Sequence, residues 1–196
     1  MSILYDIVIS VAIGGILLAM LVGFNGNIAE QATAQTVKLL AQTNLTTLTN
    51  VVEYEFRKMG YLVPKNTDSA IVYADSNKIT FKGDFDNNGT VDMLTYSLNL
   101  TGSSGNANTK TRILYRTPNN QPASAINVGI TRFRIWYYDR NGNPLTANPL
   151  PRPSQVKYMR VGINLESTVP YKATREIYVT LNPGGCWEKI IRPKNL

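Results

Sequence analysis

A short run of acidic and amide side chains, DFDNNGTVD, carries oxygen atoms at alternate positions. Gly89 is the sixth residue, where the calcium loop of an EF-hand turns sharply. The twelfth position, a bidentate glutamate in an EF-hand, is Thr95, so a calcium site here would be weak. The alternative is a polar hairpin turn, because Asp, Asn and Gly tolerate positive φ. The candidate ligands are Asp84, Asp86, Asn88, the Thr90 carbonyl and Asp92.

A second candidate is a predicted strand in which basic and aromatic side chains alternate with apolar ones. Arginines between aromatic rings can follow a nucleic-acid backbone and stack its bases, so this strand is a candidate DNA-binding surface. The alternative is a solvated surface, or one that faces another subunit. One face of the strand carries Arg132, Arg134, Trp136 and Tyr138, and the other carries Phe133, Ile135 and Tyr137. Further basic residues that could extend the first face are Lys157, Arg160, Lys172 and Arg175.

The sequence contains no catalytic constellation. It has no histidine and a single cysteine, Cys186, which we expect to be buried. These counts exclude histidine-dependent triads, Cys/His zinc sites and an intrachain disulfide. The carboxylates are scattered, and no glycine-rich loop lies between a strand and a helix. We therefore expect that the chain is not an enzyme.

A long N-terminal helix is the first element that would position these residues. The stretch from Ile7 to Phe24 has no charge and is long enough to cross a bilayer. We expect a helix over residues 1–60, with a membrane or filament-core half at 1–27 and an amphipathic half at 28–60. Gly60 and Pro64 would end it. The predicted apolar stripe of the second half is Val37, Leu40, Leu45, Leu48, Val52, Phe56 and Met59.

Residues 61–196 read as a β-rich head domain. The net charge of +7 belongs to this part, because residues 1–52 hold only Asp6, Glu30 and Lys38 as charged side chains. The predicted strands are 69–74, 78–82, 90–98, 112–116, 131–138, 155–165 and 174–181, with loops at 101–108 and 144–153. The predicted fold class is α+β, with the long N-terminal helix packed on an antiparallel sheet.

The N-terminal stretch SILYDIVISVAIGGILLAML resembles the first helix of type IV pilins and pseudopilins, whose mature start reads like FTLIELLVVVAIIGILAAI. Asp6 lies at the position of the family's near-invariant glutamate, and Gly14 and Gly15 lie in its core segment. The resemblance implies that Asp6 neutralises the N-terminal ammonium of an adjacent subunit. No basic leader ending in glycine precedes Met1, so we expect either a leader already removed or different processing. The alternative is an ordinary single-pass anchor.

Three internal motifs are similar to those of the larger minor pilins and the J-class minor pseudopilins. The first is Phe56 to Tyr61, which is similar to a helix-end R-x-x-G-Y/W motif. The second runs from Ile79 to Tyr96 and the third from Gly129 to Gly142, in the order found in those families. With the N-terminus included, the resemblance covers most of the chain.

A pilin-like subunit would be anchored in the inner membrane and then polymerise into an extracellular filament or a periplasmic pseudopilus. The implied partners are copies of itself or related pilins, a prepilin peptidase, an assembly ATPase and a platform protein. Filaments of this family often contain a locally unwound helix segment. Gly23 and Gly26 favour such melting here, and the alternative is an unbroken helix. A second hypothesis is a membrane-tethered module that binds calcium, polysaccharide or DNA without polymerising.

Overall fold

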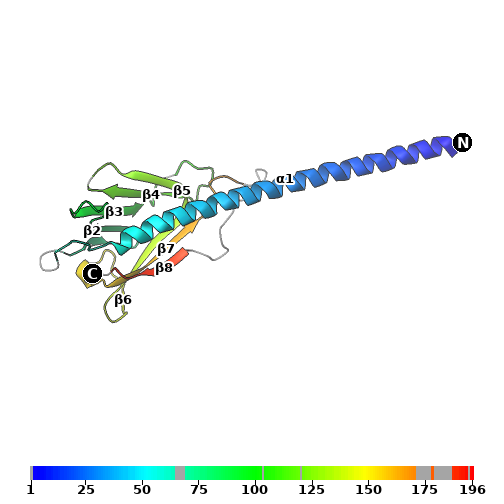
Figure 1. The fold of residues 1–196 in the computed structure, drawn as a ribbon. Helices are drawn as coiled ribbons and strands as arrows, with labels where there is room; N and C mark the ends of the chain where they lie inside the picture. Colours follow the sequence, from blue (N-terminus) through cyan, green and yellow to red (C-terminus); the bar gives the residue numbers. More distant parts are fainter. Residues whose placement is uncertain are drawn as a thin grey trace.

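One α-helix, α1 (Ser2–Arg57), forms a rod that projects from a β-rich head (Figure 1). The computed structural model describes residues 2–64, 69–102, 104–119, 121–170, 178, 187–193 and 195–196. At 1.5 Å per residue the helix is about 84 Å long. The N-terminal part of the helix is long and apolar enough to cross a membrane. The other described residues do not cover this apolar segment.

The described part of the head is an antiparallel sheet of eight strands. The strand order is β1-β2-β3-β4-β5-β7-β8, and β6 pairs with the end of β5. The strands are β1 (Ile71–Ala74), β2 (Lys78–Gly83), β3 (Asp92–Leu98), β4 (Arg112–Pro118), β5 (Ser124–Tyr138), β6 (Pro144–Leu145), β7 (Tyr158–Leu165) and β8 (Trp187–Ile191). A short 3-10 helix, η1 (Pro153–Gln155), precedes β7. The strand pairs among the described residues are all antiparallel, which confirms the predicted fold class.

The core lies between the C-terminal half of α1 and one face of the sheet (Figure 1). Phe56 of the helix contacts Phe81 edge-to-face, with ring centroids 5.0 Å apart, and Tyr96 at 5.7 Å. Tyr96 in turn stacks on Phe133. Aromatic pairs in these arrangements contribute roughly 0.5–1.5 kcal/mol beyond the burial of their area. This aromatic cluster holds the end of the rod on the sheet.

The apolar stripe of α1 differs from the prediction at one position. Leu40 is 61% exposed, and the neighbouring Ala41 is buried in its place. Residues on the buried face of a helix recur every three or four positions, and Ala41 follows Val37 by four residues. Leu40 is therefore turned by about 100° from the buried position, because each helical residue rotates by that angle. The buried residues of the stripe are Val37, Ala41, Leu48, Val52, Phe56 and Met59.

The strand bounds also differ in part. The predicted strand 131–138 is only the second half of β5, and the start of the predicted strand 155–165 is η1 and a short connection. The helix ends at Arg57, and Gly60 follows in a turn with a φ of +78°. Apart from Tyr178, the predicted strand 174–181 lies outside the described residues, as does Cys186. β8 has no counterpart among the predicted strands.

A buried polar cluster links α1 to the sheet. Glu55 lies on the inner side of the helix and is only 5% exposed. Arg116 of β4 donates to its carboxylate from Nη2 at 2.5 Å and from Nε at 3.0 Å, and the Tyr96 hydroxyl also donates to it. Burial and the negative charge of Glu55 raise the pKa of Tyr96, and the hydrogen bond from Arg116 to Glu55 raises the pKa of Arg116. Both partners therefore keep the protons that they donate.

A second polar contact joins α1 to β8 closer to solvent. Lys189 Nζ lies 2.6 Å from one Glu53 oxygen, and Arg57 Nη2 lies 2.8 Å from the other. The hydrogen bond from Lys189 outweighs the effect of burial and lowers the pKa of Glu53, with Arg57 adding to the shift. The two glutamates thus connect the helix to β4 and to β8, which lie far apart in the strand order.

Candidate functional site

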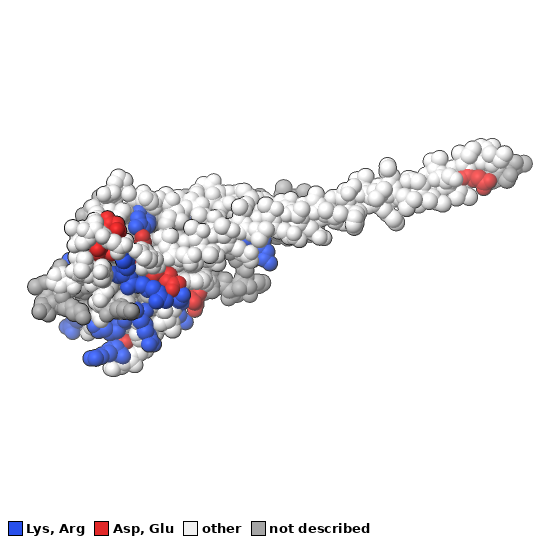
Figure 2. Space-filling model, in the orientation of Figure 1, with Lys and Arg blue, Asp and Glu red and all other residues white. Residues whose placement is uncertain are grey.

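The N-terminal part of the rod is left uncovered by the other described residues. Every large apolar side chain from Ile3 to Phe24 is more than half exposed. Figure 2 shows this part of the surface as free of Lys and Arg, with acidic atoms only near the tip. The acidic residue is Asp6, whose backbone carbonyl accepts a hydrogen bond from Ser10 Oγ at 2.7 Å. Residues 3–24 of the rod therefore present an apolar surface with a single carboxylate.

The glycines of the rod are not required by packing within the subunit. A Cβ atom added at Gly14 or Gly15 would meet no atom within 4 Å, and the same holds for Gly23 and Gly26. Each glycine still costs roughly 0.5–1 kcal/mol in a helix interior relative to alanine. The missing side chains leave room for another helix to approach the rod closely.

The helix continues without a break through Gly23 and Gly26 in the isolated chain. This agrees with the unbroken alternative for the single chain. The predicted unwinding concerns a filament, and it stays a prediction.

The acidic loop forms the hairpin between β2 and β3. One carboxylate oxygen from each of Asp84, Asp86 and Asp92 lies within 4.8 Å of the others. The Asp84 carboxylate accepts backbone N–H groups from Asn88 at 3.2 Å and from Gly89 at 3.1 Å. Gly89 has a φ of +85°, so it makes the sharp turn expected of it.

The charge of Asp84 is stabilised by its own loop. Burial alone would raise its pKa, but the N–H groups of Gly89, Asn87 and Asn88 outweigh this effect and the pKa is lowered. Lys58, just beyond the end of α1, adds a positive charge, and its Nζ donates to the Asp84 carbonyl at 2.7 Å. Lys58 Nζ also lies 3.4 Å from the Phe85 carbonyl oxygen and 5.3 Å from the centroid of the Tyr54 ring. The sequence analysis missed Lys58, although the helix-end motif contains it.

The other predicted calcium ligands are turned to different partners. Asn88 Oδ1 accepts from the Thr90 amide at 2.7 Å, and Asn88 Nδ2 donates to Asp86 at 2.9 Å. Thr95, at the twelfth position, exchanges a hydrogen bond with Thr80 within the sheet, so it does not reach back to the loop. The structure therefore brings together the three aspartates of the predicted site, and hard cations such as calcium favour carboxylate oxygens.

The basic strand lies as predicted within β5. Phe133, Ile135 and Tyr137 are buried, whereas Arg132 and Arg134 are exposed on the opposite face. Around the half-buried Trp136 ring lie three guanidinium groups, at centroid distances of 4.3 Å for Arg160, 5.4 Å for Arg134 and 5.6 Å for Arg132. Such cation–π contacts hold the arginines in place.

This surface continues across β7 to the end of β8. Tyr138 stacks on Tyr158 with centroids 4.9 Å apart, and the Arg192 guanidinium lies 5.0 Å from the Tyr158 ring. Sequence reasoning missed Tyr158 and Arg192, because they join the surface only through the pairing of β5 with β7 and of β7 with β8. Lys172 and Arg175 lie outside the described residues. We call the set Arg132, Arg134, Trp136, Tyr138, Tyr158, Arg160 and Arg192 the arginine–aromatic surface.

No protein-family model matches this chain, and no curated protein matches its sequence.

Proposed function

We propose that this chain is a structural subunit of a helical filament of the type IV pilus or pseudopilus kind. The observation that supports it is the rod, in which every large apolar side chain from Ile3 to Phe24 is more than half exposed. An apolar surface of this extent requires lipid or another apolar surface against it. A filament of this kind uses both in turn, first the bilayer and then the rods of neighbouring subunits.

Asp6 distinguishes a filament subunit from a simple anchor. An anchor gains nothing from a carboxylate, which costs roughly 2.5–3.5 kcal/mol at the bilayer centre and less near a helix end, where Asp6 lies. Between packed rods the same carboxylate can accept the positive charge of a neighbour's N-terminal ammonium, which offsets the cost and selects one axial register. Gly14 and Gly15, which no contact within the chain requires, allow neighbouring rods to approach closely.

The same function implies a location for the chain and a set of partners. Before assembly the subunit is held in the inner membrane by α1, and afterwards it lies in an extracellular filament or a periplasmic pseudopilus. Its partners are then copies of itself or related pilins, a prepilin peptidase, an assembly ATPase and a platform protein. The role is structural, not enzymatic.

The test compares Asp6→Ala with Asp6→Glu in cells that produce the chain. Filaments sheared from the cells are examined by electron microscopy and identified by their peptides. We expect Asp6→Ala to abolish the filaments while the protein still inserts in the membrane, and Asp6→Glu to retain them, because it keeps the carboxylate. Normal filaments from Asp6→Ala would contradict the proposal.

A second candidate is a membrane-tethered module that binds calcium and does not polymerise. The specific observation in its favour is the convergence of Asp84, Asp86 and Asp92 within 4.8 Å. This alternative requires the loop and an anchor but not Asp6. Replacement of Asp6 by Ala would then leave its activity unchanged, so the same pair of variants separates the two functions.

A further inference from the structure

The four arginines of the arginine–aromatic surface form a line across three strands. Arg132 and Arg134 are two residues apart on β5, about 6.7 Å along the strand. Arg134 lies opposite Gly162 of β7, and Arg160 lies two residues from that glycine. The Cα atoms of Arg134 and Arg160 are therefore separated by one strand spacing and by two residues along the strand, which is about 8 Å in total.

The next step repeats this geometry. Arg160 lies opposite Ile190 of β8, and Arg192 follows two residues later, beside the Tyr158 ring. The line from Arg132 to Arg192 is thus about 23 Å long, with similar spacing between its charges. Trp136 and Tyr158 lie between the arginines.

Among the described residues, the positive charge of this line is only partly compensated. Arg160 lies 3.6 Å from Glu188, and its Nε has no hydrogen-bond partner among the described residues. The nearby Asp139 turns into its own hairpin, where it accepts the backbone amides of Asn141 and Asn143 at 2.8 Å each. The line therefore offers guanidinium donors to an extended anionic ligand.

The aromatic part of the surface also has a specific structural basis. A Cβ atom at Gly162 would lie 3.0 Å from Cζ3 of Trp136. The missing side chain lets the indole lie over β7, between Arg134 of its own strand and Arg160 of the next. A larger residue at position 162 would push the ring away from this position.

We propose that the arginine–aromatic surface binds single-stranded nucleic acid. The phosphates follow the line of arginines, and the bases stack on the aromatic rings and guanidinium planes between them. A duplex fits less well, because its bases are already stacked and would leave the rings unused. An acidic polysaccharide would also pair with the arginines, so the experiment includes one as a competing ligand. This function is independent of polymerisation.

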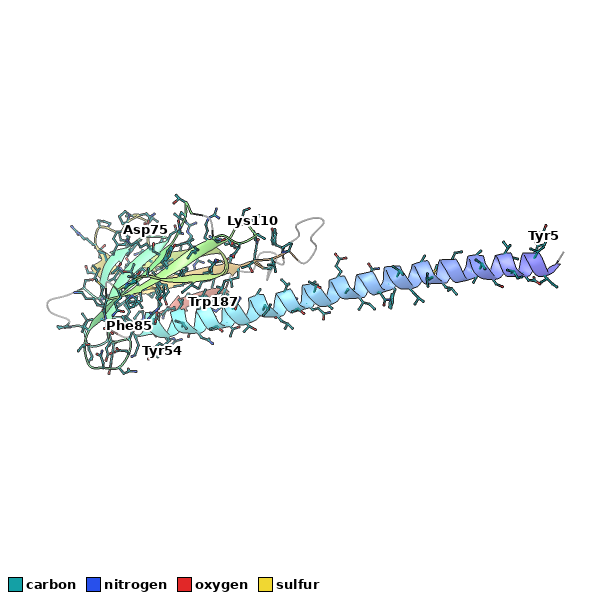
Figure 3. All side chains as sticks on the ribbon, turned by 90° about the horizontal axis from the view of Figure 1, so that it is seen from above. Tyr5, Tyr54, Asp75, Phe85, Lys110 and Trp187 are labelled. Carbon is teal, nitrogen blue, oxygen red and sulfur yellow. The ribbon has the colours of Figure 1, made fainter. Side chains whose placement is uncertain are left out.

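The experiment measures fluorescence anisotropy of a labelled fifteen-nucleotide oligo-dT with the full-length chain in nonionic detergent. The test variant is Arg132→Glu with Arg134→Glu. The matched control is Lys38→Glu with Lys110→Glu, which changes the net charge equally at exposed lysines outside the surface. Figure 3 shows Lys110 at the end of the head nearest the rod. A third variant, Trp136→Ala, removes a ring without changing the charge.

We expect at least a tenfold loss of affinity in the double-arginine variant and less than a twofold loss in the control. Trp136→Ala should lose about fivefold or more, as stacking on an aromatic ring predicts. The slope of log affinity against log salt should fall by about 1.4 in the double-arginine variant, since each phosphate contact to a single strand contributes about 0.7.

Three results would overturn the inference: no binding by the parent chain, an equal loss in the lysine control, or chondroitin sulfate binding as tightly as oligo-dT. The last would assign the surface to acidic polysaccharide. Filament formation by the double-arginine variant is recorded in parallel. A defect there without any nucleic-acid binding by the parent would assign the surface to contacts between subunits.

Discussion

Glu55 and Asp84 are both nearly covered carboxylates, yet they differ in what they can still bind. The oxygens of Glu55 are taken by Arg116 and the Tyr96 hydroxyl, which belong to the sheet on which the helix packs. Asp84 receives backbone amides of its own loop and lies near two further carboxylates. The first residue therefore serves the fold, whereas the second retains oxygen atoms that can face a cation.

Replacement of Glu55 by Ala should destabilise the chain by about 3 kcal/mol, because it leaves Arg116 half-buried without its carboxylate and Tyr96 without its acceptor. The matched change, Glu53→Ala, removes a more exposed contact and should cost about 1 kcal/mol or less. Urea unfolding of the full-length chain in detergent measures both. Equal losses in the two variants would show that the buried cluster is no more important than the exposed one.

Calcium should stabilise the parent chain weakly. With a dissociation constant of about 1 mM, as in extracellular modules, calcium at about 5 mM adds about 1 kcal/mol and raises Tm by about 2–4 °C. Asp86→Asn should abolish the shift, because Asp86 is an exposed member of the cluster, whereas Asp139→Asn in another turn should keep it. An unchanged Tm in the parent, or an equal shift in Asp86→Asn, argues against the site.

At the scale of elements, periodicity was sufficient for the helix and for most strands, because apolar side chains recur at helical or alternate spacing. It failed where other forces decide. Leu40 is more apolar than Ala41, but the rotation of α1 set by Val37 and Leu48 turns Leu40 to solvent. β8 is short and mixes charged with apolar residues, so only its pairing with β7 defines it. The acidic loop and the face of β5 were predictable, since both depend on local spacing.

The contact between α1 and β8 should depend on pH. The pKa of Glu53 is lowered in the folded chain, so its contribution is present above the ordinary glutamate pKa, near 4.5, and is lost as pH falls through the folded value. We expect the free energy of unfolding to decrease below about pH 4.5. In Glu53→Gln and in Lys189→Met the free energy of unfolding should fall less at low pH than in the parent chain. The difference should be less than about 1 kcal/mol, because the pair is partly exposed. A full decrease in both variants would assign the pH dependence to other groups.

The segment around Gly23 and Gly26 should behave differently in the free chain and in the filament. In the free chain these amides lie in an unbroken helix. If this segment unwinds in the filament, its backbone amides should exchange hydrogen faster in the filament than the amides of residues 10–20. Gly23→Ala with Gly26→Ala should slow the exchange, because each substitution favours the helix by about 0.5–1 kcal/mol. Equal protection along the rod in the filament would support the unbroken alternative.

At the scale of the whole molecule, the two parts carry different kinds of surface. Figure 2 shows the charged side chains on the head and at the tip of the rod, with an uncharged stretch between them. Within the described residues, the core of the head includes residues from the C-terminal half of α1, whereas the apolar N-terminal stretch of the helix is left uncovered. A filament whose centre is formed by the rods and whose outside is formed by the heads satisfies both surfaces.

The most direct test of this account is photo-crosslinking from within the rod. Benzoylphenylalanine in place of Leu17, in cells that assemble filaments, reports whatever lies against the apolar surface, and the same group in place of Lys38 serves as the comparison. We expect position 17 to give a ladder of adducts between subunits, which mass spectrometry maps to the rod of a neighbour. The Asp6→Ala variant should lose this ladder. Adducts with lipid alone, in both the parent and the Asp6 variant, would contradict the account.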